Sequence, residues 1–149
     1  MKLSTREDID APIGTVYDAV TDFDGFERQL LRRGIDVTRD ETQPTDVPGV
    51  CWQAQFPWRG RPHDLEAELV EIDTGQGYAI ESRTGGIVCM GVVDLVALSR
   101  SRTRLFVSLD LKPTTISSRL IVQSLKLAKG SLGRRFKSRV SEFASGIGA

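Results

Sequence analysis

The sequence predicts an α+β domain in which a curved antiparallel sheet of seven strands packs against two short helices and one long C-terminal helix. Three observations lead to this prediction. Residues 35–112 contain no convincing helical pattern, and most runs within them alternate apolar and polar side chains with the period of two that is typical of half-buried strands. Short turns separate these runs, and strands joined by short turns must pair antiparallel. Residues 115–144 instead keep apolar side chains at helical spacing.

The length and composition favour one globular domain over residues 1–149, because a chain of 149 residues can bury a core of its own. The 20 Lys and Arg residues balance the 20 Asp and Glu residues, whereas nucleic-acid-binding domains usually carry a basic surplus. We therefore expect no nucleic-acid partner. The polar N-terminal residues lack the apolar segment of a signal peptide, and we expect a cytoplasmic location.

Cysteine and histidine are too few and too far apart for a metal site. Cys51 and Cys89 have no histidine or cysteine at zinc-ligand spacing, and we expect them to be free thiols. The chain also has no phosphate-binding loop. The sequence therefore predicts a protein that needs neither a metal nor a nucleotide cofactor.

A strand and two short helices are expected at the start of the chain. Residues 2–10 alternate loosely and predict the strand. Asp10 is expected to cap the first helix, because an aspartate side chain accepts hydrogen bonds from the first free N–H groups of a helix. Asp22 or Asp24 is expected to cap the second helix in the same way, and Gly34 to end it.

The middle of the chain predicts strands only. Leu69 beside Val70 breaks the alternation and indicates a bulge. Residues 87–98 are apolar on nearly both faces, which favours a central strand. With the first strand, the expected set covers residues 2–10, 35–39, 50–58, 65–70, 78–84, 87–98 and 105–111.

The last element is predicted to be one continuous helix over residues 115–144 that covers the concave face of the sheet. Its length would be about 45 Å at 1.5 Å per residue. Gly130 and Gly133 lie inside it, and each destabilises a helix by about 1 kcal/mol relative to alanine. We expect these glycines to mark a bend or to leave space for a ligand between helix and sheet.

Four short motifs accompany this order of elements: Ile9-Asp10-Ala11-Pro12, Val16-Tyr17-Asp18-Ala19-Val20-Thr21-Asp22, Phe26-Glu27-Arg28 and Thr103-Arg104-Leu105. Together with the order of elements, they resemble the birch-pollen-allergen-like superfamily, which includes lipid-transfer START domains and polyketide cyclase/dehydratase-like proteins. The resemblance covers the whole chain and implies the helix-grip fold, with a cavity for a small hydrophobic ligand. The chain departs from the family pattern at Gln29, often tryptophan in members, and at Arg102, often glycine.

The expected ligand-binding residues are large, mostly apolar side chains on the strands and on the final helix. A long helix over a curved sheet often leaves a space that such residues line, although core packing is the alternative for each. Gln123, with Ser124, could supply a polar anchor. The predicted set is Trp52, Phe56, Trp58, Tyr78, Ile80, Met90, Val107, Leu120, Gln123 and Leu127.

Three residues are candidates for moving a proton if the protein is an enzyme: Asp94, His63 and Tyr78. His63, the single histidine, is either a solvated loop residue or a catalytic base. Asp94 interrupts an apolar strand. Facing outward it is a solvated charge, and facing inward its pKa would rise by desolvation. The loop at residues 99–102 decides between these, since one added residue reverses the faces of a strand.

Six basic residues on the final helix form either a solvated face or a docking surface for an anionic membrane or a partner protein. They are Lys126, Lys129, Arg134, Arg135, Lys137 and Arg139.

Three functions stay open on the sequence, and the binding or carriage of a small hydrophobic or amphipathic molecule leads. An enzyme of the polyketide cyclase/dehydratase type is the first alternative. An interaction module, resembling a quinone chaperone or a co-chaperone, is the second. A cavity with apolar walls favours the carrier, and a hydrogen-bonded carboxylate or histidine inside it favours the enzyme. A filled core with an exposed apolar patch favours the interaction module.

Overall fold

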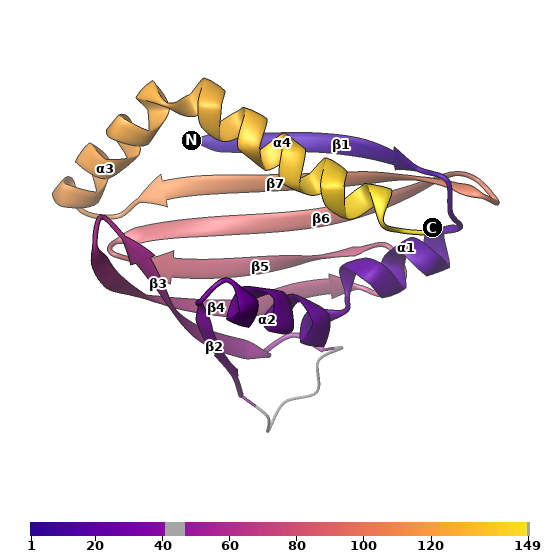
Figure 1. Ribbon diagram of the computed structural model, residues 1–149, viewed down its shortest axis with the longest axis horizontal. Coiled ribbons are helices and arrows are strands. Elements are labelled where there is room, and N and C mark those ends of the chain that lie inside the picture. The colour runs from indigo at the N-terminus through magenta and orange to yellow at the C-terminus, as the bar shows by residue number, and fades with distance from the viewer. Residues whose placement is uncertain (41–46, 149) are drawn as a thin grey trace.

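The structure is a computed structural model that describes residues 1–40 and 47–148. Part of the predicted loop over residues 43–49 therefore lies outside the described residues. The elements are β1 (Lys2–Ile9), α1 (Ile13–Val20), α2 (Phe23–Arg32), β2 (Asp36–Arg39), β3 (Cys51–Trp58), β4 (Arg61–Asp73), β5 (Gly77–Thr84), β6 (Ile87–Ser99), β7 (Arg102–Pro113), α3 (Ile116–Leu127) and α4 (Lys129–Ser145), as Figure 1 shows.

The strands form one seven-stranded sheet in the order β1-β7-β6-β5-β4-β3-β2, and each neighbouring pair is antiparallel. Tight turns make these pairings possible. Arg59 and Gly60, with φ of 52° and 76°, turn β3 into β4, and Gly85 and Gly86, with φ of 53° and 78°, turn β5 into β6. The register shifts between Leu69 and Glu71, which confirms the predicted bulge. The predicted α+β fold is therefore confirmed.

The predicted cap is confirmed for α2 and is wrong for α1. Of the two predicted alternatives, Asp22 caps α2, because its carboxylate accepts a hydrogen bond from the Gly25 N–H at 3.1 Å. Gly34 follows α2 with a φ of 80°. The Asp10 cap on α1 was a wrong prediction. Pro12 occupies the cap position and makes no side-chain bond there, and proline at that point has no N–H that needs a partner.

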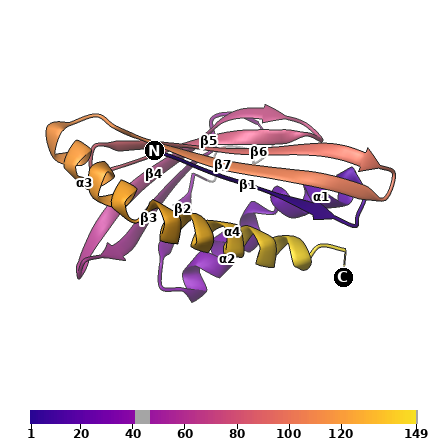
Figure 2. The ribbon, with the colours of Figure 1, turned by 90° about the horizontal axis from the view of Figure 1, so that it is seen from above.

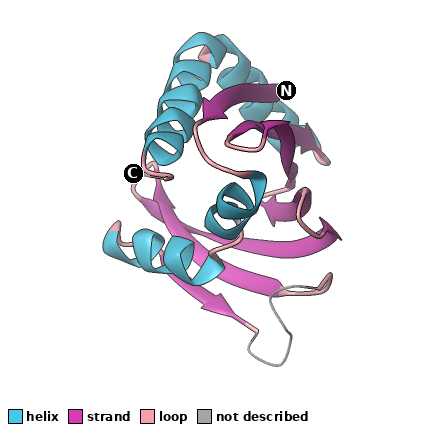
Figure 3. Ribbon diagram, turned by 90° about the vertical axis from the view of Figure 1, so that its right-hand side faces the viewer, coloured by secondary structure: helices cyan, strands magenta, loops and turns pink. Residues whose placement is uncertain are grey.

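Two hydrophobic clusters hold the helices on the sheet. The first packs α1 and the end of α4 against β1, β6 and β7, and its buried members are Ile9, Ala11, Val16, Val20, Leu95, Leu105 and Ala144. The second packs α2 against β3 and β4 through Phe23, Val50, Trp52 and Leu69. Tyr78 of β5 packs against both clusters. Figure 2 shows α2, α3 and α4 on one face of the sheet, and Figure 3 shows the ribbon from one end of the molecule.

The C-terminal helical segment is as long as expected but is interrupted at Ala128, where φ is −100° and ψ is 14°. The Ala128 N–H donates to the Leu125 carbonyl at 3.0 Å, which is the tighter turn that often ends an α-helix. Gly130 follows two residues later and lowers the helix propensity there. The segment is therefore two helices that meet at an elbow, not one rod (Figure 1).

The elbow changes what the segment covers. α4 crosses the molecule beside β1, whereas α3 leans out at one end (Figures 1 and 2). Val122 of α3 is buried, but Ile116, Leu120 and Leu127 are 82%, 62% and 92% exposed. The predicted apolar stripe is thus only partly buried against the sheet.

Candidate functional site

A cleft of about 990 Å³ lies between the sheet and the helices α1, α2 and α4. We call it the central cleft. Its floor is formed by Tyr78 of β5, Val93 of β6, and Leu105 and Val107 of β7. Tyr78 pairs with Val93, and Val93 pairs with Val107. Directly paired residues of antiparallel strands point to the same face, so the register brings these side chains together.

The walls of the central cleft come from three helices. They are formed by Val20 of α1, by Phe26 and Leu30 of α2, and by Phe136, Val140 and Phe143 of α4. The three α4 residues recur every three or four positions and therefore share one face of the helix. The volume and the mostly apolar walls are those of a small-molecule site.

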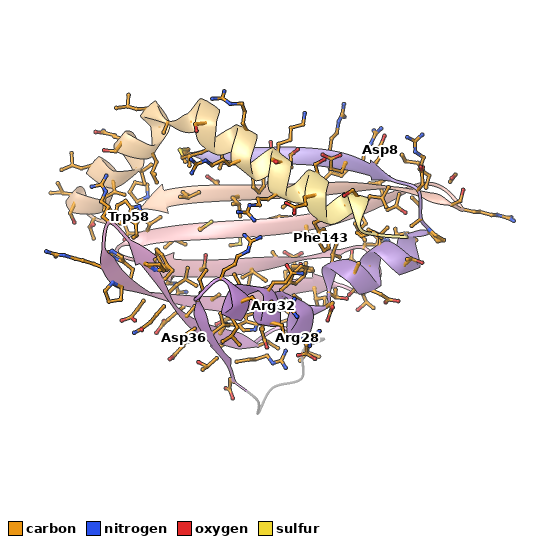
Figure 4. All side chains as sticks on the ribbon, viewed as in Figure 1. Asp8, Arg28, Arg32, Asp36, Trp58 and Phe143 are labelled. Atoms are coloured by element: carbon orange, nitrogen blue, oxygen red, sulfur yellow. The ribbon has the colours of Figure 1, made fainter. Side chains whose placement is uncertain are left out.

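Phe26 and Phe143 form a contact between α2 and α4 across the central cleft. Their ring centroids are 5.5 Å apart with an interplanar angle of 46°. Phe143 lies on the edge of α4 that faces the other helices in Figure 4. Aromatic pairs at this distance stabilise by about 0.5–1.5 kcal/mol beyond the burial of their surface. The pair therefore links two helices that the hydrophobic clusters anchor separately.

Polar side chains border the central cleft on the helix side. Gln29 and Arg33 come from the α2 region, Arg139 and Glu142 from α4, and Asp22 precedes α2. Asp22 is already engaged as the cap of α2. Arg33 and Arg139 are exposed and form no ion pair within residues 1–40 and 47–148. The cleft thus combines an apolar interior with a polar, cation-bearing rim.

Tyr78 lies on the cleft floor, but its hydroxyl is used structurally. The Oη–H donates to the Val20 carbonyl at 2.6 Å, at the end of α1. Burial raises the pKa of the phenol far above its usual value. Its ring packs edge-on against Phe23 at 5.3 Å. A phenol that holds its proton this firmly anchors α1 and is poorly suited to proton transfer at neutral pH.

His63 lies outside the central cleft, in strand β4 rather than in a solvated loop. Its ring is 5.6 Å from that of Phe56 and 5.5 Å from that of Trp58, and Nε2 lies 3.2 Å from the Trp58 carbonyl. The guanidinium of Arg59 lies over the Trp58 ring, 4.5 Å from the ring centre. These residues form an aromatic cluster at the β3–β4 hairpin, where Figure 4 labels Trp58.

Asp94 points away from the central cleft. It pairs with Phe106 and lies with Lys2 and Arg6 on the opposite, convex face of the sheet, where it is exposed. The outward alternative therefore holds. Met90 lies four residues before Asp94 on the same strand and shares that convex face.

The remaining predicted ligand-binding residues occupy other places. Trp52 is buried against Phe23 at 5.4 Å, and its Nε1–H donates to the Glu27 carboxylate at 2.8 Å. Ile80 packs on the same cluster. Leu120, Gln123, Ser124 and Leu127 are exposed on α3. Of the predicted set, the structure places Tyr78 and Val107 in the central cleft.

Sequence reasoning missed the helix residues of the cleft, above all Phe26, Phe136, Val140 and Phe143. The helical spacing of the α4 residues was visible, but it predicted only that they are buried and not that they line a space. Gly130 and Gly133 do not line the central cleft. The cleft is lined instead by members of the first hydrophobic cluster, such as Val20 and Leu105, and by residues that pack against the two clusters, such as Phe26 and Tyr78.

The described residues do not bring together three or more His, Cys, Asp or Glu side chains that could hold a metal ion. Cys51 and Cys89 are free thiols. Burial raises the pKa of the Cys89 thiol, which disfavours the reactive thiolate.

Comparisons with known proteins place this fold among several solved structures. TTHA0849 from Thermus thermophilus superposes with a TM-score of 0.68 at 16% identity, covering 97% of this chain and 95% of the other. Truncated norcoclaurine synthase from Thalictrum flavum gives 0.67 at 11% identity, covering 97% and 91%. The Zhui aromatase/cyclase from Streptomyces sp. R1128 gives 0.60 at 13% identity, covering 77% and 69%.

No protein-family model matches the chain, and no curated protein matches its sequence. At these low identities the structural similarities show a shared fold. They confirm the predicted helix-grip architecture, which this chain has in common with a plant synthase and a polyketide aromatase/cyclase.

Proposed function

We propose that this protein binds a small amphipathic molecule in the central cleft, with the apolar part against the sheet and the polar part at the rim. The single observation that carries the proposal is the cleft itself: about 990 Å³ of space with aliphatic and aromatic walls. Arg33, Arg139 and Gln29 at the rim are placed to contact a polar group. Pockets of this kind suit ligands that are held mainly by burial and oriented by a few polar contacts.

The expected affinity is moderate. Each Å² of apolar surface removed from water contributes about 25 cal/mol. Ordering the ligand and the rim side chains offsets part of this gain, and a Kd in the micromolar range, about −8 kcal/mol, is a reasonable expectation.

Binding is favoured over catalysis because the three acid–base candidates are not arranged for it. Asp94 is on the convex face, His63 is in the hairpin cluster, and the Tyr78 hydroxyl is held by a backbone carbonyl. Norcoclaurine synthase, on the same fold, is described in complex with dopamine and hydroxybenzaldehyde. That complex supports small aromatic compounds as the first ligands to test here.

A titration with fluorescent hydrophobic probes tests the proposal. Val140→Trp should fill part of the cleft and weaken probe binding about tenfold or more, since a larger side chain removes the space that the probe needs. Val96→Trp is the matched control, because Val96 lies on an exposed part of β6, is 49% exposed and does not line the cleft. Circular dichroism should show that both variants are folded.

The binding proposal fails if the folded parent binds none of a chemically diverse probe panel. It also fails if the two tryptophan variants weaken binding equally. If the probes do bind in the cleft, native mass spectrometry of protein purified from its own host should identify the mass of the bound natural molecule.

A further inference from the structure

The exposed side of α3 carries an apolar ridge that the rest of the chain does not cover. Ile116, Leu120 and Leu127 are 82%, 62% and 92% exposed. At 3.6 residues per turn these three positions lie within about 40° of one another around the helix axis. Ser118 and Val122, on the opposite side of α3, are buried. The helix is thus apolar on the side that it turns to solvent as well as on the side that it turns to the fold.

Basic residues accompany the ridge, and acidic residues are absent from its neighbourhood in the sequence. At 3.6 residues per turn, Arg119 and Lys126 lie about 90° around the helix axis from the centre of the ridge, so the two cations flank one side of it. Within residues 1–40 and 47–148, neither Arg119 nor Lys126 forms an ion pair. From Leu111 to Ser141 every charged residue is basic: Lys112, Arg119, Lys126, Lys129, Arg134, Arg135, Lys137 and Arg139.

This basic segment differs from the chain as a whole, whose formal net charge is zero. The positive charge is concentrated in α3, α4 and the residues next to them, and α3 stands at one end of the molecule (Figures 1 and 2). Only Lys112 among these cations is near a carboxylate, that of Asp110 at 3.9 Å, in the described part of the chain.

We propose that α3 docks this protein on an anionic membrane surface, with Ile116, Leu120 and Leu127 inserted among the lipids and Arg119 and Lys126 at the phosphate level. A helix with an aliphatic face beside basic side chains has the chemistry of an interfacial membrane helix. Lysine and arginine near an anionic leaflet each contribute about 1 kcal/mol, roughly fivefold in binding. Among the described residues no helix is long and apolar enough to cross a membrane.

A membrane fits the ridge better than an acidic protein does. Protein interfaces concentrate their binding energy in tryptophan, tyrosine and arginine at the centre of a closely fitting patch, and leucine is under-represented there. The α3 ridge is aliphatic apart from Gln123, which is exposed on the same side of the helix, and its cations stand at the side. Docking through α3 is independent of ligand binding, because no α3 residue lines the central cleft.

Vesicle co-flotation tests the proposal with the full chain. The parent should float with vesicles of phosphatidylcholine that contain phosphatidylserine and should float far less with phosphatidylcholine alone. Added salt should weaken the binding, because exposed charges are screened. Arg119→Gln with Lys126→Gln should reduce binding about thirtyfold, from the contribution per cation. Leu120→Ser with Leu127→Ser should reduce it about tenfold or more, through lost apolar burial.

The β6–β7 hairpin offers a matched control, since it lies at the other end of the molecule from α3 (Figure 1). Leu98 is 41% exposed there and Arg100 is also exposed. Leu98→Ser with Arg100→Gln should bind vesicles as the parent does. Circular dichroism should show a folded protein for all variants.

Three results would each overturn the proposal: a parent that ignores phosphatidylserine vesicles, α3 variants that bind like the parent, or a control variant that loses as much binding as they do. A parent that ignores vesicles but binds polyglutamate would assign the same surface to an acidic protein instead.

Discussion

The two halves of the C-terminal helical segment have the same kind of sequence and opposite surroundings. α4 turns Phe136, Val140 and Phe143 into the central cleft and ends with Ala144 buried in the first hydrophobic cluster. α3 turns Ile116, Leu120 and Leu127 to solvent. Helical spacing of apolar residues therefore shows that a helix has an apolar side, but it does not show whether protein, ligand or membrane covers that side.

The largest expected effect lies at the end of α4. Ala144→Asp should destabilise the protein by roughly 3 kcal/mol or more, because it buries a carboxylate without a partner in the cluster of Val16 and Leu105. Urea unfolding measures the change in the free energy of unfolding. Ser145→Asp is the control, since Ser145 is exposed beside it, and should cost less than about 1 kcal/mol. Equal losses would mean that the end of α4 is not anchored.

Two leucines of α3, Leu125 and Leu127, test the difference between its buried side and its exposed side. Leu125→Ala should cost about 2 kcal/mol, because Leu125 is half-buried on the inner side of the helix. Leu127→Ala should change the free energy of unfolding by less than about 0.5 kcal/mol, since its side chain is 92% exposed. Thermal and urea unfolding of both variants give the comparison. A large loss at Leu127 would indicate that the ridge is covered within the protein.

The start of α3 depends on one fully buried hydroxyl. Ser118 Oγ accepts from the Thr115 N–H at 3.0 Å, and Thr115 Oγ1 accepts from the Ser118 N–H at 3.1 Å, which is a reciprocal capping box. Ser118→Ala should cost about 1–2 kcal/mol, as expected for the loss of a cap and of a buried hydrogen bond. Exposed Ser117→Ala serves as the comparison in the same unfolding assay and should be nearly neutral.

The smallest effect tests α4 near the elbow. A methyl group at Gly133 would meet no atom within 4 Å apart from the helix's own backbone. Gly133→Ala should therefore stabilise the protein, by up to about 1 kcal/mol, because alanine is the better helix former. A rise in the urea midpoint confirms that α4 is a regular helix at this point. A fall would show that the backbone there needs the freedom of glycine.

The sequence predicted the fold well because local signals determined it. The alternation of residues 50–58, the turn glycines Gly85 and Gly86 and the bulge at Leu69 each correspond to an observed feature. The cap of α2 was narrowed to Asp22 or Asp24 for the same reason, since a cap involves residues only three apart.

The site was less predictable, because it depends on packing between distant segments. Phe26 and Phe143 meet although more than a hundred residues separate them, and only the tertiary structure brings them together. Asp94 faces away from the cleft because the pairing of β6 with β7 sets its register, which the sequence alone left open.

The sequence by itself determined the order of the elements, the strand periodicity and the basic, acid-free segment from Leu111 to Ser141. The tertiary structure decided that the final helix bends at Ala128, that its second half borders a cleft, and that its first half leaves aliphatic residues in solvent. The reason is physical. Periodicity is a property of neighbouring residues along the chain. Burial depends on which distant segments pack against each other in the folded protein.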